Sequence, residues 1–320
     1  MDVPTLAHKV AVCVFGCITS PKYCLQVLNI QETWGRRAEE KHGVPVYYFL
    51  GEERLPGLDH PELWLPSTRR VYLPGVGNDY QSASFKQNRG IKYILDHHTD
   101  VDFVFVCGTD TFLNIDALLR LVSYMNPDEK LYIGGHYGTI PLTNLPDIAK
   151  QHDDNLYDAS YSSELLRSSS EYARISSASP RIPHPYKDTN EVYFHLGGAG
   201  FVLSRGILKE LYPLLDTITE PWIESCNQMG KEQYNGACDV CIAYHAQLLG
   251  AKIVEYYYRF YECNHTGIID ISKMYGYSRY YPCCQNHLQA PNIISSHNMS
   301  LADFDNFYRI LNENGWFCKK

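Results

Sequence analysis

The sequence lacks the features that mark several classes of protein. It contains no run of about 18 or more apolar residues, which a membrane-spanning helix would need, so no membrane segment is predicted in this chain. It has no long basic run and carries a net charge of −8, which argues against a nucleic-acid partner. The segment 1–10 has no apolar core of the kind found in signal peptides. No internal repeat is visible.

Cysteine, in contrast, is plentiful. The 11 cysteines are an odd number, so at least one has no partner for a disulfide within a monomer. The pairs Cys238-x-x-Cys241 and Cys283-Cys284 have spacings that could indicate zinc. The segment around Cys238 and Cys241 fits a helix, however, whereas metal pairs usually sit on tight turns. Buried thiols or disulfides are therefore favoured over a zinc-stabilised binding module.

The order of apolar segments predicts an α/β fold. Residues 103–107 are apolar without alternation, as in a strand that is covered on both faces. Further strands are expected at 10–15, 46–50, 70–73, 131–134 and 252–258, and helices at 21–40, 80–97, 115–125, 205–214, 239–249 and 301–312. Strands that alternate with helices indicate a mostly parallel central sheet flanked by helices. We interpret the Ser-, Asp-, Tyr- and Pro-rich segment 141–191 as an insertion within one domain spanning 1–320.

Asp110 is the first candidate site residue. It closely follows the strand predicted at 103–107, and the carboxyl ends of strands are where open α/β sheets bind ligands. A carboxylate at that edge can hold a divalent cation against a diphosphate. The alternative is an aspartate that caps the helix predicted from residue 115, and for an isolated aspartate that alternative is the more common case.

Three further motifs complete the candidate site. Gly197-Gly198-Ala199-Gly200 would let the backbone approach a ligand closely, although it lacks the G-x-G-x-x-G spacing of a dinucleotide site. Asp239 precedes an amphipathic helix and could simply be its N-cap. His297 ends a short apolar segment, and it matters for function only if the fold brings it to Asp110.

In this order, the motifs resemble those of glycosyltransferase family 31 (GT31), most closely core 1 β1,3-galactosyltransferase and more distantly fringe. Residues 197–204 match the family's G-G-A-G-Y-V-L-S almost residue for residue, and the segment from Cys283-Cys284 to His297 is similar to its C-C to His ending. Weaker similarities lie at 31–37, 85–87, 106–113 and 238–240. The resemblance implies a GT-A fold, which is a Rossmann-like α/β domain.

The resemblance also implies an activity. The expected reaction is inverting transfer of a sugar, with galactose favoured, from a UDP-sugar to a hydroxyl of a glycan or glycoprotein, with a β-1,3 linkage. Asp239 would be the base, and Asp110 and His297 would hold Mn²⁺. The expected donor-binding residues are Thr19, Arg36, Lys86, Thr109, Asp110, Gly198, Ala199 and Gly200. Arg36 fits a surface helix position equally well, and Trp222 is a candidate to stack on a sugar.

One departure from the family keeps an alternative open. The family's three consecutive acidic residues are replaced by Gly108-Thr109-Asp110, and the Glu of its E-D-V motif is replaced by Cys238. A related chaperone lacks the acidic motif and is not a transferase, so a catalytically inactive chaperone-like or glycan-binding protein is the competing hypothesis. We expect a cytoplasmic protein if the chain is complete and a Golgi-lumenal one if it is trimmed from a type II membrane enzyme. A homodimer is left open.

Overall fold

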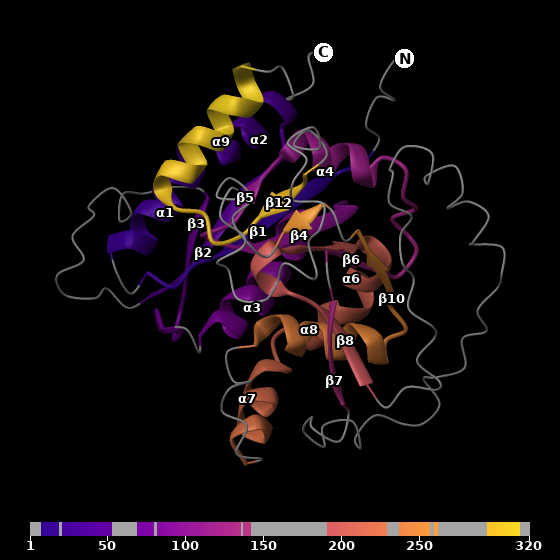
Figure 1. Ribbon diagram of the computed structural model, residues 1–320. Coiled ribbons are helices and arrows are strands. Elements are labelled where there is room, and N and C mark those ends of the chain that lie inside the picture. Colours follow the sequence, from indigo (N-terminus) through magenta and orange to yellow (C-terminus); the bar gives the residue numbers. More distant parts are fainter. Residues whose placement is uncertain are drawn as a thin grey trace.

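A seven-stranded sheet lies at the centre of the protein (Figure 1). The computed structural model describes residues 8–18, 21–52, 69–79, 82–135, 137–141, 191–228, 237–256, 259–261 and 293–313. In spatial order the strands are β10 (Lys252–Glu255), β6 (Leu131–Gly134), β9 (Phe201–Ser204), β4 (Phe103–Gly108), β1 (Val10–Phe15), β2 (Val46–Gly51) and β3 (Arg70–Leu73). Only β9 runs antiparallel to its neighbours. The predicted mostly parallel α/β fold is therefore confirmed.

Helices cover both faces of this sheet (Figure 1). One face packs against α1 (Pro21–Glu32), α2 (Trp34–His42), α4 (Ile115–Val122) and α9 (Leu301–Glu313). The other packs against α3 (Ala83–His97), α6 (Arg205–Leu211), α7 (Thr219–Gln228) and α8 (Cys238–Leu248). Strand β4 shows why its sequence does not alternate: Phe103 and Phe105 enter the first core, while Val104 and Val106 enter the second. No helix in the described ranges has both the length and the apolar character to cross a membrane.

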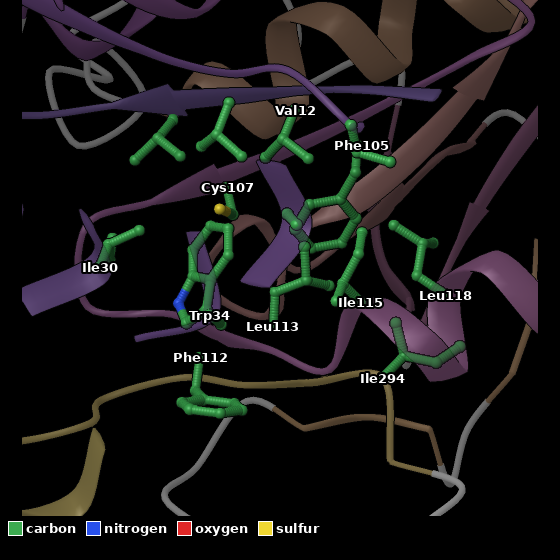
Figure 2. Close-up of a cluster of buried hydrophobic side chains, with 14 of the residues drawn as sticks. Val12, Ile30, Trp34, Phe105, Cys107, Phe112, Leu113, Ile115, Leu118 and Ile294 are labelled. Carbon is green, nitrogen blue, oxygen red and sulfur yellow. The ribbon is translucent and has the colours of Figure 1, made fainter. Parts of the chain in front are cut away.

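The Gln31–Arg37 segment of the family resemblance has a structural role here. The helix predicted at 21–40 is two helices, because the backbone at Thr33 leaves helical geometry with φ −113° and ψ −112°. This break turns Trp34 into the core with no exposed surface, where Figure 2 shows it beside Cys107. A Cβ atom on Gly35 would lie 2.7 Å from the Tyr48 hydroxyl, so only glycine fits there. The segment joins two helices to the sheet.

An ion cluster ties α2 to α4. The Asp116 side chain is only 3% exposed. Its carboxylate lies 2.7 Å from Arg37 Nε and 3.0 Å from Lys41 Nζ. His42 Nε2 is a third neighbour, at 3.3 Å. Burial alone would raise the pKa of Asp116, but hydrogen bonds from these three side chains outweigh it and hold the pKa well below its usual range.

Two small sheets bring distant segments together. Strand β12 (Ser295–Ser296) pairs antiparallel with β5 (Phe112–Leu113) and parallel with β11 (Phe260–Tyr261). Strand β7 (Tyr137–Pro141) pairs with β8 (Glu191–His195), so the two ends of the predicted insertion lie side by side. The interior of that insertion, residues 142–190, lies outside the described residues, as do Cys283 and Cys284.

Candidate functional site

A cavity of about 250 Å³ opens at the carboxyl ends of β1 and β4. This is the sheet edge where open α/β folds bind ligands. The cavity is lined by Phe15, Cys17, Tyr23, Ala83, Gly108, Thr109, Asp110, Gly197, Gly198, Cys238, Asp239 and His297. All four motifs singled out in the sequence therefore contribute to one cavity.

The pairing of β5 with β12 places His297 beside Asp110. Ser296 lies opposite Phe112, so the residues that flank this short ladder face each other across the chain. The backbone amide of Met299 donates to the Asp110 carbonyl at 3.0 Å, and His297 Nε2 lies 3.3 Å from Asp110 Oδ2. Burial would raise the pKa of the Asp110 carboxyl, but the hydrogen bond and charge of His297 outweigh it, with a smaller contribution from Lys22, and the pKa is lowered.

This pair fits the requirements of a divalent cation. Neighbouring ligands of an octahedral ion with bonds of about 2.1 Å lie about 3 Å apart, close to the observed separation of Asp110 Oδ2 and His297 Nε2. Both side chains line the cavity. No cluster of three or more metal-binding side chains occurs in the described parts of the chain. A cation held here would thus take its remaining ligands from the substrate or from water.

The glycines of the Gly197–Gly200 turn are required by what packs against them. A Cβ atom on Gly197 would lie 2.8 Å from Asp239 Cβ, and one on Gly198 would lie 2.3 Å from the His297 ring. Gly200 has a φ of +77°, a conformation that favours glycine. Two adjacent glycines therefore contact the candidate base and the candidate metal ligand. The motif works here as a close-approach turn.

Asp239 lies in the first turn of α8 rather than at its N-cap. The helix begins at Cys238. Its N-cap residue is Ala237, whose methyl side chain cannot form a capping hydrogen bond. The N-cap alternative for Asp239 is therefore wrong. Its Oδ2 accepts from the Gly197 amide and its Oδ1 from the Val240 amide, each at 2.9 Å. These two bonds fix the carboxylate against the cavity wall.

Lys86 lies behind the cavity rather than in its lining. The side chain is fully buried in α3, and its Nζ donates to Cys17 Sγ at 3.6 Å. Burial lowers the pKa of Lys86, and its contact with Cys17 opposes that shift only in part. Cys17 itself lines the cavity. It lies two residues after the end of β1, as Asp110 lies two residues after the end of β4, and the same carboxyl-end rule would have identified it from the sequence.

The remaining candidates divide into three groups. Thr109 and Gly198 line the cavity, and the Thr109 hydroxyl donates to the buried Gln26 side chain at 3.1 Å. Ala199 and Gly200 belong to the turn but not to the lining. Thr19 lies outside the described residues.

Two expectations from the sequence do not agree with the structure. Arg36 is 49% exposed on α2, lies 3.5 Å from Glu32 on the preceding helix, and does not line the cavity. Arg36 is therefore a surface residue of its helix, which was the alternative to donor binding. Trp222 has no exposed surface and packs against Tyr244 in the core, so it cannot stack on a sugar. Arg36 lies in a motif segment, but motif similarity does not show which way its side chain points.

Six cysteines are free thiols: Cys13, Cys17, Cys24, Cys107, Cys238 and Cys241. Cys13, Cys24, Cys107 and Cys238 are buried, and burial raises the pKa of each thiol. Cys238 and Cys241 lie together on α8, as expected for a helical pair. This arrangement favours structural thiols over zinc.

The mostly parallel sheet, with one reversed strand next to β4 and a cavity at its carboxyl edge, is consistent with the GT-A fold expected from the sequence. The chain belongs to the Fringe-like family: residues 76–255, more than half of the 320-residue chain, match the family described as Fringe-like. Members of this family are glycosyltransferases, so the general class predicted from the sequence is confirmed. The more specific likeness to core 1 β1,3-galactosyltransferase stays a prediction.

Among solved structures, the chain is similar to "a glycosyltransferase involved in the glycosylation of the major capsid of PBCV-1". The two share 12% sequence identity, with a TM-score of 0.40, over 94% of this chain and 99% of that chain. No curated protein matches the chain.

Proposed function

We propose that the protein is an inverting glycosyltransferase that moves a sugar from a UDP-sugar to a hydroxyl of a glycan or glycoprotein acceptor. One observation supports this above the others: Asp239 and the Asp110–His297 pair line the same cavity, held by adjacent residues of one turn. Direct displacement at a sugar carbon needs a base for the acceptor and a group that binds the departing diphosphate. Asp239 and the Asp110–His297 pair would fill these two roles on either side of the turn.

In the proposed reaction, the acceptor hydroxyl oxygen attacks the anomeric carbon of the donor. Asp239 takes the proton of that hydroxyl as the new carbon–oxygen bond forms. The bond between the anomeric carbon and the diphosphate oxygen breaks, and its electron pair leaves with UDP. Attack from the face opposite UDP inverts the configuration, which from an α-linked donor gives a β linkage.

Asp110 and His297 would hold Mn²⁺, since an imidazole and a carboxylate together suit this ion better than Mg²⁺. When bound, the ion would stabilise the negative charge that develops on the departing diphosphate. The Lys22 ammonium acts on the Asp110 carboxyl from the start of α1, and Lys86 adds a buried positive charge behind Cys17. The chain thus provides cations around the place proposed for the diphosphate.

Galactose as the donor sugar and β-1,3 as the linkage are proposed from the motif resemblance. Residues 197–204 and the segment ending in His297 are its most specific parts. The segment 141–191 begins and ends at the paired strands β7 and β8, one of which leads into the Gly197–Gly200 turn. That connection makes the segment our candidate for acceptor recognition.

The test is calorimetric titration of UDP with and without Mn²⁺, followed by a screen of UDP-sugars for turnover by the same sample. Binding of UDP that depends on Mn²⁺, with turnover of one UDP-sugar, is the expected result and would identify the donor. Absence of UDP binding under both conditions would refute the proposal.

A second candidate is a non-catalytic GT31-like chaperone or glycan-binding protein. The observation that favours it is the replacement of carboxylates by Gly108 and Thr109 on the cavity wall, with Cys238 in place of a glutamate. This candidate predicts binding of a glycan or an unfolded client without turnover of any UDP-sugar. The same screen therefore separates it from the transferase.

A further inference from the structure

Helix α3 carries three consecutive polar residues with no exposed surface: Lys86, Gln87 and Asn88. Buried polar groups are costly unless their hydrogen bonds are satisfied. The Gln87 side chain is satisfied only in part. Its Nε2 donates to the Cys238 carbonyl at 2.8 Å and lies 3.3 Å from Asn88 Oδ1, while its Oε1 has no partner among the described residues. Packing alone would favour an apolar side chain at this position.

The bond to Cys238 acts on the part of α8 that carries Asp239. Cys238 is the first residue of the helix and Asp239 the second. Ala237 has no polar side chain to cap this turn, and the Val240 amide donates to Asp239 Oδ1 within the turn itself. Gln87 adds a hydrogen bond from a neighbouring helix, to the Cys238 carbonyl at the start of α8. Both contacts of its amide group require a donor, so the orientation of the amide is determined.

Asn88 extends the same connection. Its Nδ2 donates to Thr219 Oγ1 at 3.0 Å and lies 3.9 Å from Cys241 Sγ, one turn further along α8. Helix α3 thus holds the start of α7 and the first turn of α8 through side-chain amides. Asp239 in turn accepts a hydrogen bond from the Gly197 amide. The next residue, Gly198, packs against the His297 ring.

We propose that Gln87 is a positioning residue, whose hydrogen bond to the Cys238 carbonyl sets the place of the Asp239 carboxylate against Gly197. Its catalytic consequence rests on the function proposed above, in which Asp239 is the base. Gln87 does not line the cavity. Its loss should therefore lower kcat and leave the affinity for the donor unchanged.

The test compares Gln87→Leu with Ser84→Ala. Leucine keeps the approximate volume of glutamine and removes the hydrogen bond. Ser84 is a matched control because it lies on the same helix, is fully buried, and has a hydroxyl with no partner among the described residues. In Gln87→Leu, the amides of Gly197 and Val240 should exchange with solvent about tenfold faster by NMR, and kcat should fall about tenfold with KM unchanged. Ser84→Ala should change neither quantity.

A third variant, Gln87→Glu, tests the hydrogen bond through the pH dependence of kcat, which a purely structural role of residue 87 would not change. A protonated glutamic acid can donate to the Cys238 carbonyl, whereas a glutamate would repel it. The kcat of this variant relative to wild type should therefore rise as the pH falls, while the same ratio for Gln87→Leu stays constant.

Unchanged exchange at Gly197 and Val240 in Gln87→Leu would overturn the proposal whatever the activity. A raised KM with unchanged kcat would also overturn it. The proposed function fails separately, if wild-type protein binds no UDP and turns over no UDP-sugar. In that event the exchange measurement still decides whether Gln87 positions Asp239.

Discussion

Replacing Gly198 with alanine tests the link between the glycine turn and the candidate metal pair. The added Cβ atom would lie 2.3 Å from Cε1 and Nδ1 of His297, while carbon contacts are normally about 3.5–4.0 Å. The ring must therefore move by more than about 1 Å. Since His297 Nε2 lies 3.3 Å from Asp110 Oδ2, a shift of that size takes the imidazole out of position to share an ion with the carboxylate.

The expected result is a loss of Mn²⁺-dependent UDP affinity of about 10- to 100-fold, the range typical when the support of a metal ligand is disturbed. UDP binding without Mn²⁺ should change little, because Asp239 and the loop after β1 are untouched. The His297 side chain is 20% exposed at the cavity edge, so the ring can move without opening the core and the protein should stay folded.

The assay is calorimetric titration of UDP at several Mn²⁺ concentrations, with thermal unfolding as the check on folding. Gly77→Ala is the control, because the nearest atom to its added Cβ would be Asp79 Oδ2 at 3.4 Å, an ordinary contact. Wild-type Mn²⁺ dependence in a folded Gly198→Ala protein would refute the placement of the metal at His297.

Three further predictions concern the carboxylates. Asp239→Asn should abolish transfer, by about 10²- to 10⁴-fold or more, with UDP affinity largely intact in calorimetry; lost UDP affinity in a folded variant would contradict its role as base. Asp110→Ala and His297→Ala should each weaken Mn²⁺-dependent UDP binding, and unchanged affinity in both would remove the metal site. Asp116→Asn should lower the free energy of unfolding by about 3 to 5 kcal/mol at neutral pH in urea titration. Because the pKa of Asp116 is depressed on folding, this difference should be full above about pH 4 and shrink as the pH falls further; a constant difference would contradict the ion cluster.

The strands and the position of Asp110 could be predicted from the sequence because their signals are local. The run Phe103–Cys107 is apolar at every position because both faces of β4 meet a core. The carboxyl-end rule then places Asp110 at the ligand edge. The same rule applied to β1 predicted Thr19, which lies outside the described residues, and it points equally to Cys17, which lines the cavity.

The meeting of His297 with Asp110 had no local signal. It depends on β12, a strand of two residues that pairs with β5, another of two residues, from a distant part of the chain. Strands this short show no periodicity. The likeness to GT31 supplied the expectation instead, and the same likeness misplaced Arg36 because similarity between helices does not show which way a side chain points.

The loss of acidic residues before Asp110 need not mean the loss of a metal site. A Cβ atom on Gly108 would lie 3.2 Å from Asp110 Oδ1, so any side chain at residue 108 would crowd the carboxylate that faces His297. The Thr109 hydroxyl donates to buried Gln26 Oε1, a bond that a carboxylate at residue 109 could not donate. The surroundings of these two residues thus suit glycine and threonine as they stand. One carboxylate paired with one imidazole is what the cavity presents for the proposed Mn²⁺, and we expect that restoring the missing acids costs stability without strengthening the binding of Mn²⁺.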